Sequence, residues 1–106
     1  MLSQETLYRA AQALGEAARP AKVILFGSYA RGDADEGSDV DFMVIKPEVD
    51  NPGAEMARLS LLLGAMRLPA DVLVYSEAEA ERRRNWCSSA VYWALREGKL
   101  LYESVQ

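Results

Sequence analysis

The sequence predicts a single α/β domain over residues 1–106, with a mixed sheet of about four strands covered by helices. Short apolar runs alternate along the chain with longer segments of helical periodicity, and this alternation is typical of α/β domains. No linker-like stretch or internal repeat divides the chain. Its 106 residues, half of them hydrophobic, are enough for one modest core.

The expected strands are short apolar runs bounded by turn-forming residues. They lie at about 23–26, 39–46, 71–75 and 99–103. The expected helices follow apolar stripes with helical spacing. They span about 4–19, a single turn at 29–31, a segment from 52 to just before Pro69, and 77–97. Residues 32–38 are rich in Gly, Asp and Glu, and we expect a loop there.

Capping residues support these helix boundaries. Ser3 is a suitable N-cap for the first helix, and Asn51 precedes Pro52 as a cap before a favoured first-turn proline. Ser76 and Glu79 have the spacing of a capping box, so we expect one long helix from there to a terminating Gly98. Its expected apolar face comprises Trp86, Ala90, Trp93, Ala94 and Leu95.

The charge and composition exclude several kinds of chemistry. The formal net charge is −4, which argues against strong general binding to nucleic acids. The chain contains no histidine, so Ser-His-Asp and Cys-His catalysis and most zinc sites are excluded. The remaining candidates for catalysis are carboxylates, hydroxyls and a bound metal, and aspartate oxygens favour a hard cation such as Mg²⁺.

The sequence also predicts a cytoplasmic location. No apolar run approaches the ~20 residues that a membrane helix needs, so we expect no membrane association. Gln4, Glu5 and Arg9 occupy the region where a signal peptide would be apolar. Cys87 is the single cysteine of the chain, which excludes an internal disulfide and fits a reducing compartment.

A first candidate for a binding site is the turn that follows the strand at 23–26. Gly27 allows close approach of a ligand to the backbone, and the start of a helical turn favours an anion. Ser28 adds a hydroxyl donor, and Arg31 lies on the same turn. This pattern is compatible with a triphosphate site, but taken alone it is more typical of an ordinary strand-to-helix turn.

A second candidate is a group of carboxylates at the starts of two strands. Asp39 and Asp41 point to the same side because side chains alternate along a strand. Two such charges about 4 Å apart repel by roughly 4 kcal/mol at an effective dielectric near 20, and a divalent cation reverses that effect. Asp71 becomes a third member if its strand lies beside this one. The alternative is a set of solvated strand ends.

The two candidates together match a known pattern. Phe26-Gly27-Ser28-Tyr29-Ala30-Arg31-Gly32, followed by Ser38-Asp39-Val40-Asp41-Phe42, resembles the signature of DNA polymerase β-like nucleotidyltransferases, in particular their minimal, MNT-type members.

The resemblance implies a role for each matching residue. Asp39 and Asp41 would bind two Mg²⁺ ions, and Asp71 would bind the metal near the acceptor and take the acceptor's proton. Gly27, Ser28, Arg31 and Ser38 would be nucleotide-binding residues, with ATP as the expected substrate.

The acceptor is inferred from the same resemblance. MNT-type proteins act as antitoxins beside a HEPN-type ribonuclease toxin, which implies transfer of AMP from ATP to a tyrosine of that partner. Two alternatives remain open: an antitoxin that acts by occlusion without catalysis, and transfer to a small molecule or an RNA end. The partner surface is also open, because Arg82 to Arg84 and Trp86 fit either a solvated basic face over a buried Trp86 or a docking edge.

Overall fold

The computed structural model describes residues 1–104. Its strands are β1 Lys22–Phe26, β2 Val40–Lys46, β3 Ala70–Ser76 and β4 Lys99–Glu103. Its helices are α1 Gln4–Ala18, α2 Ser28–Arg31, α3 Pro52–Ala65, α4 Glu77–Arg83 and α5 Ala90–Glu97. All four expected strands are present, with boundaries shifted by one residue at most.

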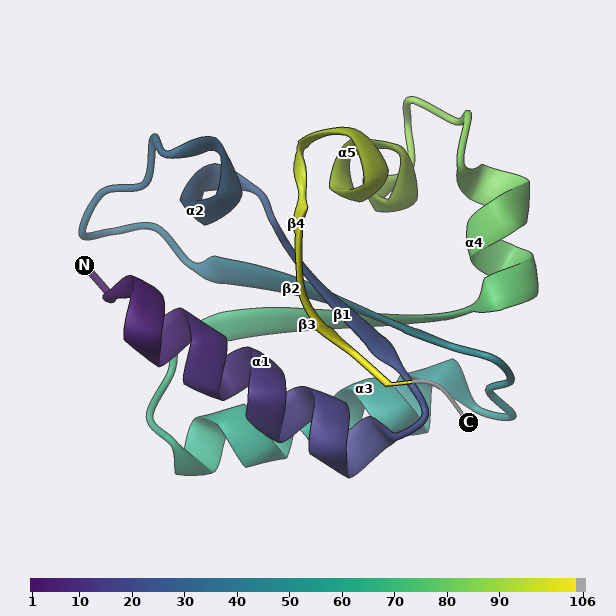
Figure 1. Ribbon diagram of the computed structural model, residues 1–106, viewed down its shortest axis with the longest axis horizontal. Helices are drawn as coiled ribbons and strands as arrows, with labels where there is room; N and C mark the ends of the chain where they lie inside the picture. Colours follow the sequence, from purple (N-terminus) through teal and green to yellow (C-terminus); the bar gives the residue numbers. More distant parts are fainter. Residues whose placement is uncertain (105–106) are drawn as a thin grey trace.

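The four strands form one sheet in the order β3-β2-β1-β4 (Figure 1). Strand β1 runs antiparallel to both of its neighbours, whereas β2 and β3 are parallel. The prediction of a mixed, four-stranded sheet is therefore confirmed. Parallel strands need a crossover connection, and α3 provides it between β2 and β3.

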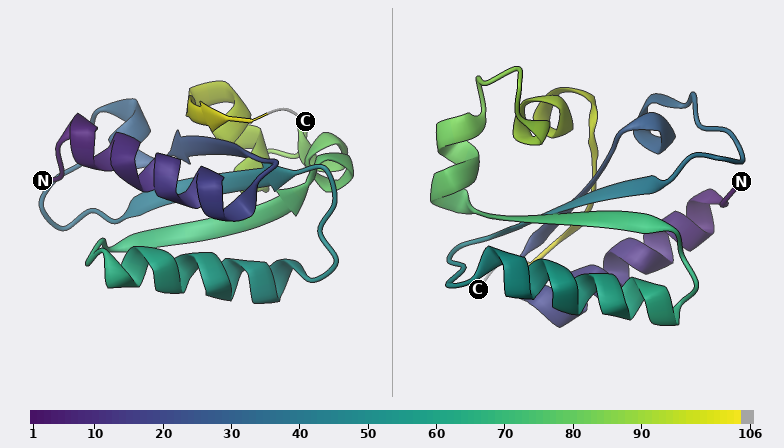
Figure 2. Two further views of the ribbon diagram at one scale, coloured as in Figure 1. Left: turned by 60° about the horizontal axis from the view of Figure 1, so that its bottom comes forward. Right: turned by 180° about the vertical axis from the view of Figure 1, so that it is seen from behind.

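Helices cover both faces of the sheet, in two unequal layers (Figure 2). Helices α1 and α3 bury the larger core against one face, where Val40, Phe42 and Val44 of β2 are fully buried. Helices α4 and α5 cover the other face, where Met43 and Ile45 of the same strand belong to a smaller core. The expected alternation along β2 is confirmed, and Asp41 lies on the face of the smaller core.

The predicted N-caps are confirmed by hydrogen bonds. The Ser3 hydroxyl accepts from the amide of Thr6 at 3.1 Å, and the Asn51 side chain accepts from the amide of Ala54 at 3.0 Å. Ser76 caps α4 in the same way. Each bond satisfies one of the amides that a helix start leaves without an intrahelical partner.

The prediction of one long helix from Ser76 to Gly98 is wrong. Helix α4 ends at Arg83, and α5 begins only after a second N-cap, Ser89, whose hydroxyl accepts from the amide of Val91 at 3.2 Å. Asn85, Ser88 and Ser89 favour caps and turns over helix interiors, because their side chains compete for backbone hydrogen bonds.

The break also changes which residues are buried. Trp86, Trp93 and Leu95 were expected in the apolar face, but they are 46%, 47% and 46% exposed. Ala94 is buried as expected, and Val91 is buried beside it. The turn at residues 84–89 redirects the chain, so that two short helices cover the sheet with small residues.

Gly98 ends α5 for a reason other than the expected one. Its backbone is extended, not left-handed. A Cβ atom at this position would overlap the carbonyl oxygen of Ala94 and the Cγ2 atom of Ile24. The glycine therefore permits close packing of the α5–β4 corner against β1.

None of the helices within residues 1–104 is long and apolar enough to span a membrane.

We expect Gly98→Ala to lower the free energy of unfolding by about 1–3 kcal/mol, because the overlap forces the corner away from β1. Gly64→Ala is a matched control, since Gly64 lies in α3 with open space around its Cβ position. That change should raise stability by up to about 1 kcal/mol through helix propensity. Urea unfolding of both variants tests the pair, and equal effects would contradict it.

Candidate active site

The turn between β1 and α2 has the geometry of an anion site. Gly27 has a positive φ of 77°, and its carbonyl accepts from the amides of Ala30 and Arg31 at 3.1 and 3.0 Å. Helix α2 thus begins directly after Gly27, with Ser28 as its first residue. The first amides of a helix have no intrahelical partner and favour negative charge. With only four residues, α2 contributes mainly these amides and little macrodipole.

This turn lies directly against the carboxylate of Asp41. Phe26 pairs with Asp41 in the β1–β2 ladder, so the next residue of the turn reaches the carboxylate. A Cβ atom on Gly27 would overlap Oδ2 of Asp41. Glycine at position 27 therefore suits both the left-handed backbone and the space that the Asp41 side chain occupies.

Three aspartates lie at this edge of the sheet. The parallel β2–β3 ladder pairs Asp41 with Asp71, so the strand adjacency on which the third carboxylate depended is confirmed. Both lie at strand positions that share a face with Met43 and Leu73 of the smaller core. Asp39 directly precedes β2. Asp41 is half-buried, whereas Asp39 and Asp71 are exposed.

The electrostatics of Asp41 reflect this arrangement. Burial raises the pKa of the Asp41 carboxyl above its ordinary value of 3.8, and the negative charges of Asp71 and Asp39 raise it further. The guanidinium of Arg31 acts in the opposite direction. Ionising Asp41 in the folded protein is thus less favourable than ionising a free carboxyl, and nearby positive charge offsets that cost.

The carboxylates fit a hard cation by their chemistry, but they are not closed around one. Within residues 1–104, no three Asp, Glu, His or Cys side chains are grouped so that they could hold a metal ion as they stand. The set offers only oxygen donors, and its mutual repulsion would be relieved by a divalent cation. Binding would require the exposed side chains of Asp39 and Asp71 to turn toward Asp41.

Arg31 lies beside the turn with two acidic neighbours. Its Nε atom is 3.2 Å from Oδ2 of Asp33, and its Nη1 atom is 4.0 Å from Oε1 of Glu97. The side chain is 41% exposed. It is close enough to Asp41 to influence the pKa of that carboxyl, so an anion bound between them would compete with Asp33 and Glu97 for the guanidinium.

Two further residues of the motif have structural contacts. The Ser38 hydroxyl accepts from the amide of Asp35 at 3.0 Å and donates to the carboxylate of Asp35 at 3.2 Å, which closes a turn just before Asp39. The hydroxyl of Tyr29 accepts from the amide of Leu2 at 3.2 Å, and its ring packs against the larger core. Tyr29 therefore anchors the N-terminus.

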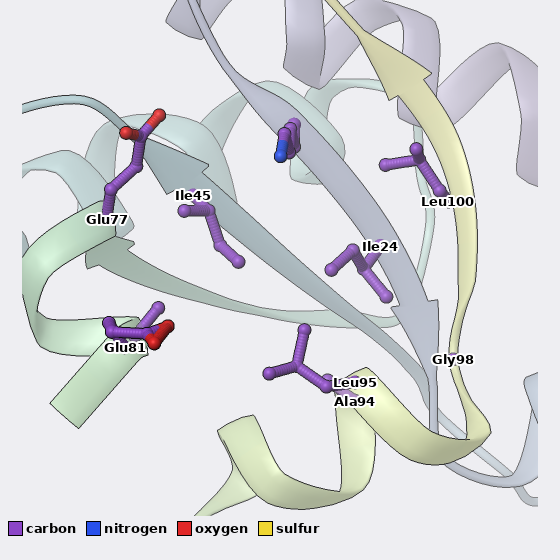
Figure 3. A pocket seen from close by; sticks show the side chains of 10 residues that line it. Ile24, Ile45, Glu77, Glu81, Ala94, Leu95, Gly98 and Leu100 are labelled. Atoms are coloured by element: carbon purple, nitrogen blue, oxygen red, sulfur yellow. The ribbon is translucent and has the colours of Figure 1, made fainter. Parts of the chain in front are cut away.

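A hollow of about 490 Å³ adjoins the turn. It is lined by Phe26, Gly27, Arg31, Ala90, Trp93 and Glu97. No motif in the sequence marks Trp93 and Glu97 as site residues, because they reach the turn only through the packing of α5 against β1. A separate hollow of about 460 Å³ lies between α4, α5 and β4 (Figure 3). Its lining includes Ile24, Ile45 and Leu100 but none of the expected site residues.

We expect Gly27→Ala to destabilise the protein more than Gly32→Ala. Both glycines have positive φ, which costs an alanine about 1–2 kcal/mol, but Gly32 faces open space. At Gly27 the overlap with Asp41 adds a further cost of about 1–3 kcal/mol. In a double-mutant cycle, Asp41→Ala should recover part of the Gly27→Ala loss. Strictly additive free energies of unfolding would refute the contact.

We expect Asp41→Asn to stabilise the protein at pH 7 in buffer containing a chelator. Because the pKa of Asp41 is raised on folding, its ionisation disfavours the folded state, and this penalty grows as pH rises above 3.8. The gain from the variant should therefore shrink as pH falls toward 3.8. Asp50→Asn, at an exposed position outside the site, is the control. A pH-independent gain at Asp41 would contradict the electrostatic account.

Comparison with known proteins identifies the family of this chain. The family model for the nucleotidyltransferase domain matches residues 7–99. Two similar proteins of Methanocaldococcus jannaschii are named as candidate protein adenylyltransferases. MJ0604 is 37% identical over 82 residues, which are 76% of this chain and 77% of the relative. MJ0141 is 42% identical over 53 residues, or 50% of this chain, and the match spans only about half (52%) of the relative.

One chain of a solved complex has the same fold as this protein. The complex contains a tri-AMPylated HEPN toxin and an MNT antitoxin from Shewanella oneidensis, and the matched chain superposes with a TM-score of 0.59 at 19% identity. The superposition covers 96% of this chain and 74% of the matched chain. With the glycine turn, the paired aspartates and the match over residues 7–99 in place, the chain belongs to the nucleotidyltransferase domain family.

Proposed function

We propose that this nucleotidyltransferase is a magnesium-dependent antitoxin that transfers AMP from ATP to a tyrosine of a HEPN-type ribonuclease toxin and thereby neutralises it. The observation that carries the proposal is the position of Asp41, opposite Asp71 in the β2–β3 ladder and against the Gly27 turn. This single edge of the sheet combines a site for phosphates with carboxylates for a divalent cation.

Each residue of the site has a proposed role. Asp39 and Asp41 would hold Mg²⁺, which would neutralise charge on the phosphates. Gly27 and Ser28 present backbone amides and a hydroxyl to the phosphates, and Arg31 adds a cationic contact. Ser38 was also expected to bind nucleotide, and its contacts with Asp35 suggest that it acts by fixing the loop that carries Asp39.

The proposed reaction is an in-line displacement at the α-phosphorus of ATP. The acceptor oxygen forms a bond to the α-phosphorus, the bond to the bridging oxygen breaks, and pyrophosphate leaves. Asp71 accepts the proton of the acceptor hydroxyl and passes it to solvent. The protein contributes position and electrostatics to this step, which requires no covalent intermediate with the chain.

Similar proteins support a protein acceptor. MJ0604 and MJ0141 are named as candidate protein adenylyltransferases, and the Shewanella complex contains a HEPN toxin that carries AMP groups. Occlusion is the second candidate, since it predicts exposed apolar surface on the antitoxin. Trp93, Leu95 and Leu100 in and beside α5 are each about half exposed.

Transfer of label from α-³²P-ATP to a HEPN-type toxin from the same genome tests the proposal. We expect the Asp39→Ala, Asp41→Ala double variant to lose at least about a hundredfold in rate, because removing the cation's ligands costs several kcal/mol in the transition state. Asp50→Ala serves as the matched control outside the site. Full labelling by the double variant would refute catalysis by these residues. If the double variant transfers no label but still neutralises the toxin, occlusion is favoured.

A further inference from the structure

The two edge strands of the sheet differ in how far they are protected from further pairing. In the order β3-β2-β1-β4, strands β3 and β4 each have a strand neighbour on one side only. The free side of an edge strand presents amides and carbonyls that can pair with another extended chain. Proteins usually prevent this with short strands, bulges, charged side chains or a covering element.

Strand β4 is a protected edge. It is five residues long, and it begins and ends with charged residues, Lys99 and Glu103. Its ladder with β1 is interrupted by a register shift between Val23 and Ile24. The side-chain amide of Gln12 also donates to the carbonyl of Leu101 at 3.2 Å. Strand β4 is therefore a poor template for a regular added strand.

Strand β3 is long, regular and mostly apolar. All seven of its residues pair with β2 without a register shift. Residues 72–75 are Val-Leu-Val-Tyr, and the one charged residue of the strand is Asp71. Among residues 1–104, the backbone of residues 70–75 forms hydrogen bonds with β2 alone. The right-hand view of Figure 2 shows β3 at the front of the molecule between α3 and α4, with no other element across its outer edge.

The open edge of β3 adjoins the candidate active site. Asp71 is paired with Asp41 on β2 and lies on the same face of the sheet. Neighbouring strands are about 4.8 Å apart, so a strand added to β3 would place one residue beside Asp71 on the side away from Asp41. Asp71 would then stand between the proposed cation site and the added residue. This is the position required of a group that takes the proton of an entering hydroxyl.

We propose that the acceptor protein presents its tyrosine on an extended segment that pairs with the outer edge of β3, with the tyrosine opposite Asp71. This inference rests on the proposed function. The occupant is a polypeptide because free amides and carbonyls match another backbone. Nucleic acid is disfavoured, since β3 has no basic residue and its one charge is negative. A tyrosine side chain is long enough to reach past the Asp71 carboxylate toward the phosphates, whereas a serine side chain is not.

The same pairing predicts which neighbours of the tyrosine are favoured. Alternate residues of adjacent strands share a face, so the residues two and four positions from the tyrosine would lie beside Leu73 and Tyr75. Both of these side chains are half-buried against the smaller core. Apolar side chains therefore suit these two positions of the partner. The backbone pairing provides affinity, and the two side-chain contacts provide preference.

Peptides with methylated amides test the pairing. Each capped peptide has a tyrosine at one end, valines at the second and fourth positions from it and threonines between, and both chain directions are made. Binding is measured by calorimetry without ATP or a divalent cation, and ¹⁵N NMR follows hydrogen exchange of the protein's amides. We expect one direction to bind and to protect amides of β3 but not of β4. Methylating one alternate set of peptide amides should weaken that binding by at least about tenfold, because hydrogen bonds are lost, and methylating the other set by less than about twofold.

A variant of β3 tests the register. Leu73→Ala should weaken binding of the peptide by about two- to fivefold, because it removes a cross-strand contact. Leu61→Ala, which removes a side chain that is 76% exposed on α3, is the matched control and should bind as the unchanged protein does. Circular dichroism melts establish that each variant is folded. The methylated peptides are used with the unchanged protein, so they keep the test valid if Leu73→Ala unfolds.

Several results would overturn the proposal: no binding in either direction, equal weakening by both methylated sets, protection of β4 instead of β3, or unchanged binding by Leu73→Ala. A dimer in which the outer amides of β3 are already protected would assign the edge to a second copy of the chain, and would overturn it too. The outcome is separable from the proposed function. Peptide binding without AMP transfer would retain the docking edge and reject catalysis, whereas equal AMP transfer to both methylated peptides would retain catalysis and reject the pairing.

Discussion

The pairing of β2 with both of its neighbours is the constraint on which the candidate site depends. Its antiparallel partner β1 ends at the edge where β2 begins, which brings the Gly27 turn against Asp41. Its parallel partner β3 begins at that same edge, which places Asp71 opposite Asp41. A slip of one residue in either ladder would turn these groups to opposite faces, because side chains alternate along a strand.

Holding three carboxylates near one another destabilises the fold, and the larger core on the opposite face of the sheet offsets that cost. Asp41 is partly removed from water beside two other carboxylates, and its raised pKa records that cost. Directly behind it, Val40 and Phe42 are fully buried under α1 and α3. The larger core thus holds the start of β2 in place, so the carboxylates cannot move apart through the backbone.

The face that carries the site is covered sparingly. Helices α4 and α5 present small residues such as Ala80 and Ala94 to the sheet, and they leave Trp86 and Trp93 half exposed. One continuous helix would have placed Trp86 and Trp93 on a single apolar stripe, as the helical spacing predicted. The turn between the two helices instead leaves Trp86 exposed, and Trp93 of α5 lines the hollow beside Gly27. The small size of the core on this face and the exposure of the two tryptophans thus both result from the break between α4 and α5.

The sequence by itself determined the strands, the N-caps at Ser3, Asn51 and Ser76, the alternation along β2 and the glycine turn, because each depends on local spacing, propensity and side-chain chemistry. It also carried the motif by which the family is found. Only the tertiary structure decided that Asp71 lies opposite Asp41 and that Trp93 and Glu97 border the Gly27 turn. Strand order and burial depend on contacts between distant parts of the chain, which local periodicity does not encode.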